Sequence, residues 1–437
     1  MAEINKFLNA LAGFLILVAI LTLAPGCDNK SEESSEGSKK TQVTELIDET
    51  VGESVEIDWW QFWSDPGIKP TIKLMIEEFE SQNPNIKVNV TDLTWDNGHD
   101  KLVISLAAGA GPDLFELGSD WVPEFAANNR LANLEANLRT RMPDFLGWES
   151  ASKDGAVFGH PWILGSRVLF YNRDLMIQAG YTDSFPPMAL KEFSSLCFKI
   201  DSLSPKIYGW GSNAAEKHRL YKKFLPFFWT LGGELFSENN EYCVISSQFG
   251  VAALKAYHKL HLGCSMVDTQ RRLDDAFLKG TLGVVFSGEW LLKRIYNEKP
   301  DLNFVTGVFP GKSFPGTSFM GGEYLVINAD SDKKGAALRL LKFITNPENQ
   351  IRFCKANYST CPSSIEAAKD SFFTSDPNIQ VFVKQLRSAK APPFEPTWVY
   401  IEEQIEKAVE RVLFEDVAPE IALHEAREAI QLISRGN

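Results

Sequence analysis

Tryptophans stand at several places in this chain where they could form a binding surface. The chain has eleven of them, and an indole ring offers a flat apolar face to a ligand while its N–H group needs a partner once buried. Core packing is the commoner role of any single tryptophan. Positions after predicted strands favour a binding role for Trp63, Trp229 and Trp290. The full set of candidates is Trp60, Trp63, Trp121, Trp162, Trp229, Trp290 and Trp398.

Charged side chains near these tryptophans offer hydrogen-bonding partners to a polar ligand. Carboxylates and guanidinium groups can each bind two polar groups at once. The candidates are Asp96, Asp120, Arg167 and Glu323. Asp120 and Glu323 would instead be solvated or capping residues in a chain without two lobes. Gly321 and Gly322 either bring the backbone close to a ligand or simply bend the chain at the start of a strand.

The segments that must position these residues begin with a strand–helix–strand–helix–strand series. Apolar alternation predicts the strands, and apolar spacing of three and four residues predicts the helices. The strands are 55–63, 86–90 and 113–117, and the helices are 70–82 and 101–110. Such a series requires parallel strands, whose carboxyl ends meet at one edge of the sheet. Three loops should therefore meet there, carrying Trp60, Trp63 and Ser64, then Trp95 and Asp96, then Gly118, Ser119, Asp120 and Trp121.

The stretch 157–175 predicts a crossing between two lobes. Pro161 and Gly165 interrupt its apolar run, so we expect the backbone to change neighbours at Gly165. This places Trp162, Arg167 and Tyr171 near a cleft. A second crossing is expected at 319–327, a strand with Gly321 and Gly322 near its start.

A second α/β segment follows the first crossing. The fold class is therefore α/β, with two lobes, each a mostly parallel sheet flanked by helices, and a cleft between them. Further strands are predicted at 208–211, 281–286, 304–310 and 319–327. Further helices are predicted at 172–179, 190–203, 220–231, 247–262, 274–279, 336–345, 347–356, 381–388, 400–414 and 419–434.

Length and charge limit the classes of function. The 437 residues, 44% of them apolar, suffice for two domains of ordinary size. Lys and Arg number 44 against 57 Asp and Glu. Nucleic acids and anionic membrane surfaces demand clustered basic residues, so neither is expected as the main partner.

The N-terminus predicts a targeting segment and a tether. Phe7 to Leu23 is largely apolar, follows Lys6, and leads into small residues before Cys27. This resembles a bacterial lipoprotein signal peptide over 1–26, with Cys27 lipidated after cleavage. An uncleaved anchor helix is the alternative. Residues 27–54 are rich in Ser, Glu, Lys and Thr and predict a flexible tether.

Several other motifs carry little weight. Five cysteines lie beyond Cys27, and Cys354 with Cys361 is the pair that we expect among them. His258, His261 and Cys264 could face a metal on one helix, but no fourth ligand is evident. Gly311-Lys-Ser lacks the glycine spacing of a phosphate loop. Acidic pairs such as 274–275 and 402–403 are typical of helix surfaces, so no catalytic residue, cofactor or metal site is predicted.

Taken in order, several short segments resemble the family 1 extracellular solute-binding proteins of bacterial ABC importers, of the maltose-binding-protein type. The resemblance extends from Val55 to Cys361. It is carried by 78–88, 107–113, Trp121 with Phe125, 131–134, 167–175, Trp229 with Gly232 and Gly233, Gly280, Gly288 with Trp290, and 321–328.

This resemblance implies a non-enzymatic, monomeric protein whose two lobes close over a small molecule, usually a mono- or oligosaccharide, and present it to a membrane permease. It implies lobe I at 55–165 and 322–372, and lobe II at 166–321 and 373–437. A lipid anchor would hold it at the outer face of the cytoplasmic membrane. The implied ligand contacts are Trp60 or Trp63, Asp120, Trp121, Trp162 to Arg167, Trp229, Trp290, Gly321, Gly322, Glu323 and Trp398.

A sugar fits these residue types, because a pyranose has a C–H face that packs on an aromatic ring and a rim of hydroxyls that binds carboxylates and Arg. Two alternatives stay open. One is a binder of another solute, such as a polyamine, a glycerol phosphodiester or an iron complex, although an anionic ligand would need more Arg than Arg167 alone. The other is a secreted carbohydrate-active enzyme, which would need a pair of carboxylates in the cleft.

Overall fold

The structure is a computed structural model. It describes residues 54–95, 97–183, 185–216, 218–237, 242–311, 315–359 and 361–435. The predicted signal peptide, the tether up to residue 53, Cys27 and Asp96 lie outside the described residues. None of the helices in the described ranges combines the length and apolar character needed to span a bilayer.

The first sheet contains the strand series predicted at the start of the chain. In it, β1 pairs in parallel with both β2 and β3, which confirms the predicted order. β12 joins this sheet antiparallel to β3 and to β6. The strands are β1 (Val55–Gln61), β2 (Ile86–Asp92), β3 (Leu114–Gly118), β6 (His160–Ser166), β12 (Ser318–Ile327), β13 (Cys361–Pro362) and β14 (Ala389–Lys390).

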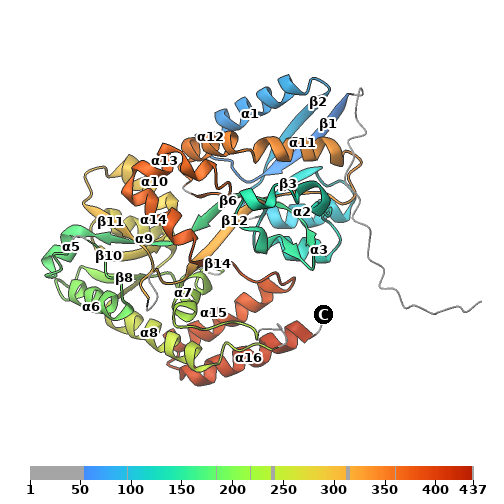
Figure 1. Cartoon of the computed structure of the whole chain (residues 1–437). Helices are drawn as coiled ribbons and strands as arrows, with labels where there is room; N and C mark the ends of the chain where they lie inside the picture. Colours follow the sequence, from blue (N-terminus) through green and yellow to red (C-terminus); the bar gives the residue numbers. More distant parts are fainter. Residues whose placement is uncertain are drawn as a thin grey trace, which may run out of the picture. The chain divides into compact units, whose positions relative to one another are not determined.

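Helices cover the first sheet, as Figure 1 shows for α1, α11 and α12 near β1 and β2. In α1, the side chains of Ile72, Met75, Ile76 and Phe79 are buried at the predicted helical spacing. The helices of this part are α1 (Lys69–Gln82), α2 (Gly98–Ala107), α3 (Val122–Ala127), α4 (Glu135–Leu138), α11 (Lys334–Ile344), α12 (Pro347–Asn357) and α13 (Ser371–Ser375).

The second sheet has the order β11-β7-β10-β8-β9. Its strands are β7 (Val168–Asn172), β8 (Tyr208–Ser212), β9 (Ser265–Val267), β10 (Leu282–Ser287) and β11 (Phe304–Gly307). Both sheets are mixed: β10 is parallel to β8 but antiparallel to β7. The antiparallel pairs are those of β7 with β10 and β11 in the second sheet, and those of β6 and β12 in the first.

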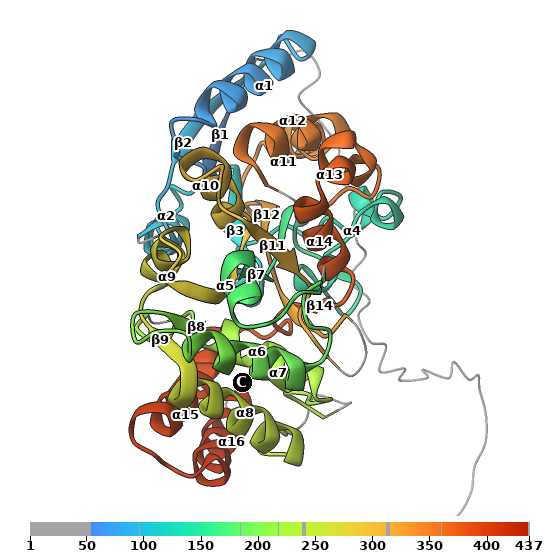
Figure 2. The same cartoon turned by 90° about the vertical axis from the view of Figure 1, so that its left-hand side faces the viewer.

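Helices α15 and α16 lie beside α7 and α8, as both Figure 1 and Figure 2 show. They therefore extend the part of the molecule that holds the second sheet. The helices of this part are α5 (Arg173–Gln178), α6 (Leu190–Asp201), α7 (Tyr221–Thr230), α8 (Gln248–Cys264), α9 (Gln270–Leu278), α10 (Glu289–Glu298), α15 (Trp398–Phe414) and α16 (Pro419–Arg435). Helix α14 (Pro377–Leu386) contacts strands of both sheets. Short pieces complete the fold: η1 (Met142–Asp144), η2 (Trp148–Ser150), β4 (Ser152–Lys153), β5 (Ala156–Val157) and η3 (Ala367–Lys369).

The first crossing lies at Arg167, between β6 and β7. The predicted change of neighbours at Gly165 is wrong, because Gly165 still pairs with Gly321 and the next pair is Ser166 with Met320. Gly322 pairs with Leu164, and a Cβ on Gly322 would approach the carbonyl oxygen of Ile163 to 2.9 Å. The glycines thus permit β6 and β12 to lie close where both strands leave the first sheet.

The five cysteines beyond Cys27 are all buried thiols. The structure forms no disulfide among Cys197, Cys243, Cys264, Cys354 and Cys361, so it does not contain the expected bond between Cys354 and Cys361. Buried in apolar surroundings, a thiol packs as a small hydrophobic side chain. Burial accordingly raises the pKa of Cys354, and the nearby Cys361 adds to that shift.

Candidate ligand-binding site

The main cavity lies between the two sheets and has a volume of about 1060 Å³. One side consists of the loops after β1, β2 and β3 together with β12. The opposite side comes from α7, α10 and the start of α15. Arg167 of the first crossing also lines it. Residues from both lobes therefore surround the same space.

The loops after β1, β2 and β3 bring an aromatic wall to the cavity. Trp95 stacks on Phe62 with ring centroids 4.2 Å apart and an interplanar angle of 19°. Trp121 lies 5.3 Å from Trp95 between ring centroids, and His99 lies 5.0 Å from Trp121. Trp63 lines the same cavity. The parallel order of the strands is the reason why these rings meet at one edge of the sheet.

A second aromatic face comes from Trp290 at the start of α10. Arg167 places its guanidinium carbon 4.5 Å from the centroid of this ring, a cation–π geometry. Trp290 Nε1 donates a hydrogen bond of 2.8 Å to Asp274 Oδ2. The indole is thus held at its N–H edge, while 36% of the residue stays exposed.

Two carboxylates, Glu289 and Glu323, face Arg167 in the cavity. Burial, and then the charge of Glu289, raise the pKa of Glu323 to about 8, although Arg167 opposes the shift. Burial also raises the pKa of Glu289, again against the effect of Arg167. Glu289 Oε2 is buried and has no hydrogen-bond partner among the described residues. Such an oxygen is an acceptor that a ligand hydroxyl could satisfy.

One ion pair spans the cavity. Lys222 Nζ on α7 lies 3.7 Å from Asp120 Oδ2, which follows β3. Burial lowers the pKa of Lys222, and Asp120 counteracts this effect. The pair therefore connects the first sheet to the helices of the second.

Helix α15 closes one end of the cavity through its acidic side chains. Glu402 Oε1 lies 2.8 Å from His218 Nδ1, and Glu406 Oε2 accepts a 2.8 Å hydrogen bond from the backbone N–H of His218. His218 has a positive φ of 59°, a conformation that costs free energy unless neighbouring contacts hold it. Burial, and then the charge of Asp120, raise the pKa of Glu402 to about 7. α15 thus fixes the loop that precedes Lys222.

The structure brings together eight of the predicted ligand contacts. These residues line the main cavity: Trp63, Asp120, Trp121, Arg167, Trp290, Gly321, Gly322 and Glu323.

Four predicted tryptophans do not line this cavity. Trp162 and Trp398 are 0% and 1% exposed, and they pack against Phe353 and Tyr221 respectively. Trp229 is buried and stacks on Phe319 with an interplanar angle of 17°. Trp60 is half-buried on β1, where alternation turns it away from its buried neighbour Trp59. The apolar cores thus take up Trp162, Trp229 and Trp398, whereas Trp60 packs against the first core as a partly buried ring.

Other cavity residues were not among the predicted contacts. Trp95 lies in the loop after β2, which the sequence predicts at the edge of the sheet. Its position after a strand is the signal that could have identified it as a contact. The remaining ones stand on helices whose relation to the cleft no local pattern reveals. They include His99, Lys222, Glu289, Lys293 and Glu402, and Arg219 in the loop before α7 joins them.

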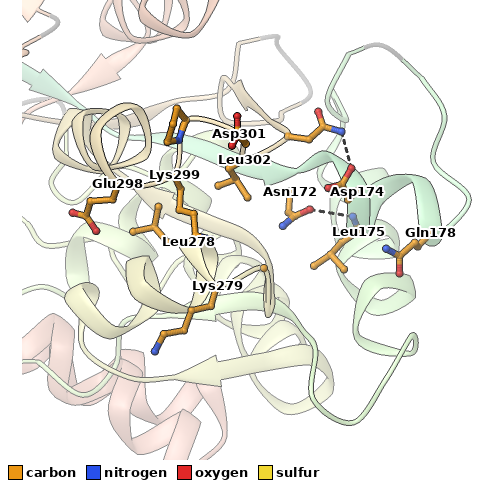
Figure 3. Close-up of a pocket in the computed structure, with 13 residues that line it drawn as sticks. Asn172, Asp174, Leu175, Gln178, Leu278, Lys279, Glu298, Lys299, Asp301 and Leu302 are labelled. Carbon is orange, nitrogen blue, oxygen red and sulfur yellow. Dashed lines mark hydrogen bonds between the residues drawn. The ribbon is translucent and has the colours of Figure 1, made fainter.

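A smaller hollow of about 580 Å³ lies between α5, the end of α9 and the segment that joins α10 to β11 (Figure 3), and it shares Glu298 with the main cavity. Two hydrogen bonds join groups of its lining: Asn303 Nδ2 donates to Asp174 Oδ1 at 2.7 Å, and the Leu175 N–H donates to Asn172 Oδ1 at 3.1 Å. Among the described residues, no aromatic side chain lines it. These features favour a structural role.

Metal ligation finds no support in the described part of the chain, where no group of three or more His, Cys, Asp or Glu side chains is placed to hold an ion.

Two lobes with a cavity between them define the class of two-lobe, type II periplasmic binding proteins. The chain belongs to the bacterial extracellular solute-binding protein family, whose sequence profile matches residues 65–351.

Solved structures share this fold. An ABC transporter solute-binding protein from Thermotoga lettingae, bound with alpha-D-tagatose, superimposes with a TM-score of 0.76 and 26% identity, over 87% of this chain and 100% of that one. The sugar-binding protein MalE from Xanthomonas citri has a TM-score of 0.78 and 24% identity, over 87% and 98% of the two chains. The maltooligosaccharide ABC transporter solute-binding lipoprotein of Streptococcus pneumoniae R6 is 22% identical over 414 residues, covering 89% of this chain and 88% of that protein.

Proposed function

We propose that this protein captures a mono- or oligosaccharide outside the cytoplasm and delivers it to the membrane permease of an ABC importer. The observation that carries the proposal is the cavity of about 1060 Å³ between the lobes, lined by indole rings and by charged groups. Family membership supports the transport role. The relatives and neighbours whose names mention a maltooligosaccharide, a sugar or tagatose support the ligand class.

The cavity supplies what a pyranose needs. Trp95, Trp121 and Trp290 offer flat faces to its C–H side. Hydroxyl groups on the rim could donate to the free oxygen of Glu289 and to the Asp120 carboxylate. A sugar that contacts both lobes would shift the protein toward its closed state. The size of this shift is set by how much more tightly the sugar binds the closed state than the open state.

The proposed location is the outer face of the cytoplasmic membrane. A lipid on Cys27 would anchor the chain there, and 27–54 would act as the tether. The proposed working form is a monomer without a cofactor. The proposed lobe boundaries are those of the sequence, 55–165 with 322–372 and 166–321 with 373–437.

One observation keeps a hydrolase as a second candidate. Glu289 and Glu323 are two carboxylates in one cavity, both with raised pKa values, and glycosidases use such a pair. We propose that this pair binds and does not cleave, because the family is one of solute-binding proteins.

The test is a screen of neutral mono- and oligosaccharides by thermal shift and tryptophan fluorescence, followed by chromatography of each sugar that binds. A bound sugar raises the melting temperature by mass action, and we expect it to be recovered intact. Slow release of shorter sugars would favour the hydrolase. Binding of polyamines, glycerophosphodiesters or iron complexes, with no response to any sugar, would overturn the ligand class.

A further inference from the structure

A side cavity of about 440 Å³ continues from the main cavity beneath Arg167 and Trp290. It shares six lining residues with the main cavity, including these two and Lys222, and it extends to Lys223 and Asn213. Six cationic side chains line it, against two acidic ones, Glu216 and Asp274. The cations are Arg167, Arg219, Lys222, Lys223, Arg271 and Arg294.

Two buried cations, Lys223 and Arg167, have only carboxylates beyond ion-pair distance nearby: Asp274 for Lys223, and Glu289 and Glu323 for Arg167. Lys223 is 5% exposed and donates a 2.7 Å hydrogen bond to the backbone oxygen of Phe286. Arg167 has the Trp290 ring beneath its guanidinium. Within the part of the chain that the structure describes, neither makes an ion pair. Burying a charge costs free energy, and these more distant carboxylates offset that cost only in part, so an anion in direct contact would stabilise the arrangement.

The cations also repel one another. Burial, and then the charge of Arg167, hold the pKa of Lys223 well below its usual range. Arg219 adds to the effect, whereas Asp274 and Glu216 oppose it. Arg219 likewise lowers the pKa of Lys222. An anion between these groups would relieve the repulsion and gain charge-assisted hydrogen bonds.

The acids of the side cavity are already engaged. Asp274 accepts hydrogen bonds from Gln270 Nε2 at 2.8 Å, from Ser287 Oγ at 3.1 Å and from Trp290 Nε1 at 2.8 Å. Glu216 accepts the backbone N–H of Gln270 at 3.1 Å and lies 3.6 Å from Arg219. Asn213 is 1% exposed, and its Oδ1 has no hydrogen-bond partner among the described residues. This oxygen can only accept, so a water or a ligand hydroxyl would satisfy it, and the case for an anion rests on the cations alone.

We propose that the side cavity binds an anionic substituent, a carboxylate or a phosphate, on the sugar held in the main cavity. This rests on the proposed function and narrows it to acidic saccharides. From the sequence, an anionic ligand is not expected, because Arg167 is the only arginine among the predicted contacts. Folding adds α7 and the loop before it, which carry Arg219, Lys222 and Lys223.

The first arm of the test uses simple anions. Sodium phosphate and sodium acetate are compared with sodium chloride at equal ionic strength, and the melting temperature is measured. We expect phosphate or acetate to raise the melting temperature of the wild-type protein above its value in chloride. The anion that raises it more shows whether the site prefers a phosphate or a carboxylate. The gain should shrink in Arg219→Gln and in Lys223→Met.

The second arm uses matched sugars. Maltose, cellobiose and chitobiose are each compared with analogues that carry a uronic acid or a 6-phosphate on the non-reducing unit. We expect an acidic analogue to bind about ten-fold more tightly than its neutral parent, as one charge-assisted contact would give. Both variants should remove this preference. Lys255→Gln, which breaks an exposed pair with Glu420 on α16, is the control and should keep it.

The outcomes separate the two proposals. If neutral sugars bind as tightly as acidic ones, the anion site is wrong and the sugar-binding function stands. The same conclusion follows if the preference for acidic sugars survives in both variants. Stabilisation by phosphate or acetate that the variants lose, without binding of any sugar, would support the anion site and count against the sugar. No response in either arm would contradict both. If Lys223→Met does not fold, Arg219→Gln still tests the anion site, because Arg219 is exposed and its replacement leaves the core unchanged.

Discussion

Lys222 Nζ and Asp120 Oδ2 lie 3.7 Å apart and form an ion pair across the main cavity. Asp120 follows β3 of the first sheet, whereas Lys222 belongs to α7 beside the second. Both side chains retain some contact with solvent, at 25% and 15% exposure. The pair is thus a direct polar link between the lobes, made without a ligand.

We expect Asp120→Asn to shift the ligand-free protein toward an open form. A partly exposed ion pair contributes about 0.2–1 kcal/mol, which is enough to change a balanced equilibrium between open and closed lobes. Small-angle scattering should show a larger radius of gyration for the variant, and high salt should have the same effect on the wild type. Lys73→Gln, which breaks an exposed pair within α1, is the control. Equal radii for Asp120→Asn and wild type would show that the pair does not hold the lobes together.

Trp290→Ala should weaken sugar binding by about 1–3 kcal/mol, because it removes an aromatic face from the cavity. It also removes one donor from Asp274, so we expect a loss of stability of about 1 kcal/mol. Titration of tryptophan fluorescence and urea unfolding measure the two effects.

Trp229→Ala is the matched comparison. This ring is buried against Phe319 and lies outside the cavity, so its removal should lower stability by about 3–5 kcal/mol. Affinity per folded molecule should change much less than in Trp290→Ala. The reverse pattern would place Trp229 in the site and Trp290 outside it.

The stability of the ligand-free protein should fall as the pH rises from about 4.5 to about 8. The pKa of Glu323 is about 8 in the folded state, against 4.5 without burial. Between these values the folded protein binds more protons at this group than the unfolded chain, so unfolding becomes easier as the pH increases. The stability that protonated Glu323 contributes is fully present below about pH 4.5 and is lost as the pH rises through about 8.

Glu323→Gln is the test of this pH dependence. It should flatten the decline in the free energy of unfolding, measured in urea at several pH values, because glutamine does not ionise. Glu77→Gln, on the exposed side of α1, is the control and should leave this decline unchanged. A pH profile that Glu323→Gln leaves unchanged would assign the dependence to other groups.

Cys27→Ser should release the protein from membranes, since the proposed anchor is a lipid on this thiol. Fractionation of cells followed by immunoblotting measures this distribution. Retention of the variant in the membrane fraction would instead support an uncleaved N-terminal helix.

Much of the fold was predictable because its signals are local. The alternation in 86–90 and the spacing of Ile72, Met75, Ile76 and Phe79 each predict one element, and the structure confirms both. The parallel order of β1, β2 and β3 followed from the helices between them. The crossing was located to within two residues, because Gly165 interrupts an apolar run but still pairs with Gly321.

The sequence by itself determined the two α/β segments, the loops that meet at the edge of the first sheet, and the aromatic character of the site. Periodicity and strand order suffice for these features. Only the tertiary structure decided that Trp162, Trp229 and Trp398 pack in the cores, and that Arg219, Lys222 and Lys223 gather beneath Trp290. The physical reason is that burial and charge clustering depend on contacts between segments far apart in the chain, which no local pattern encodes.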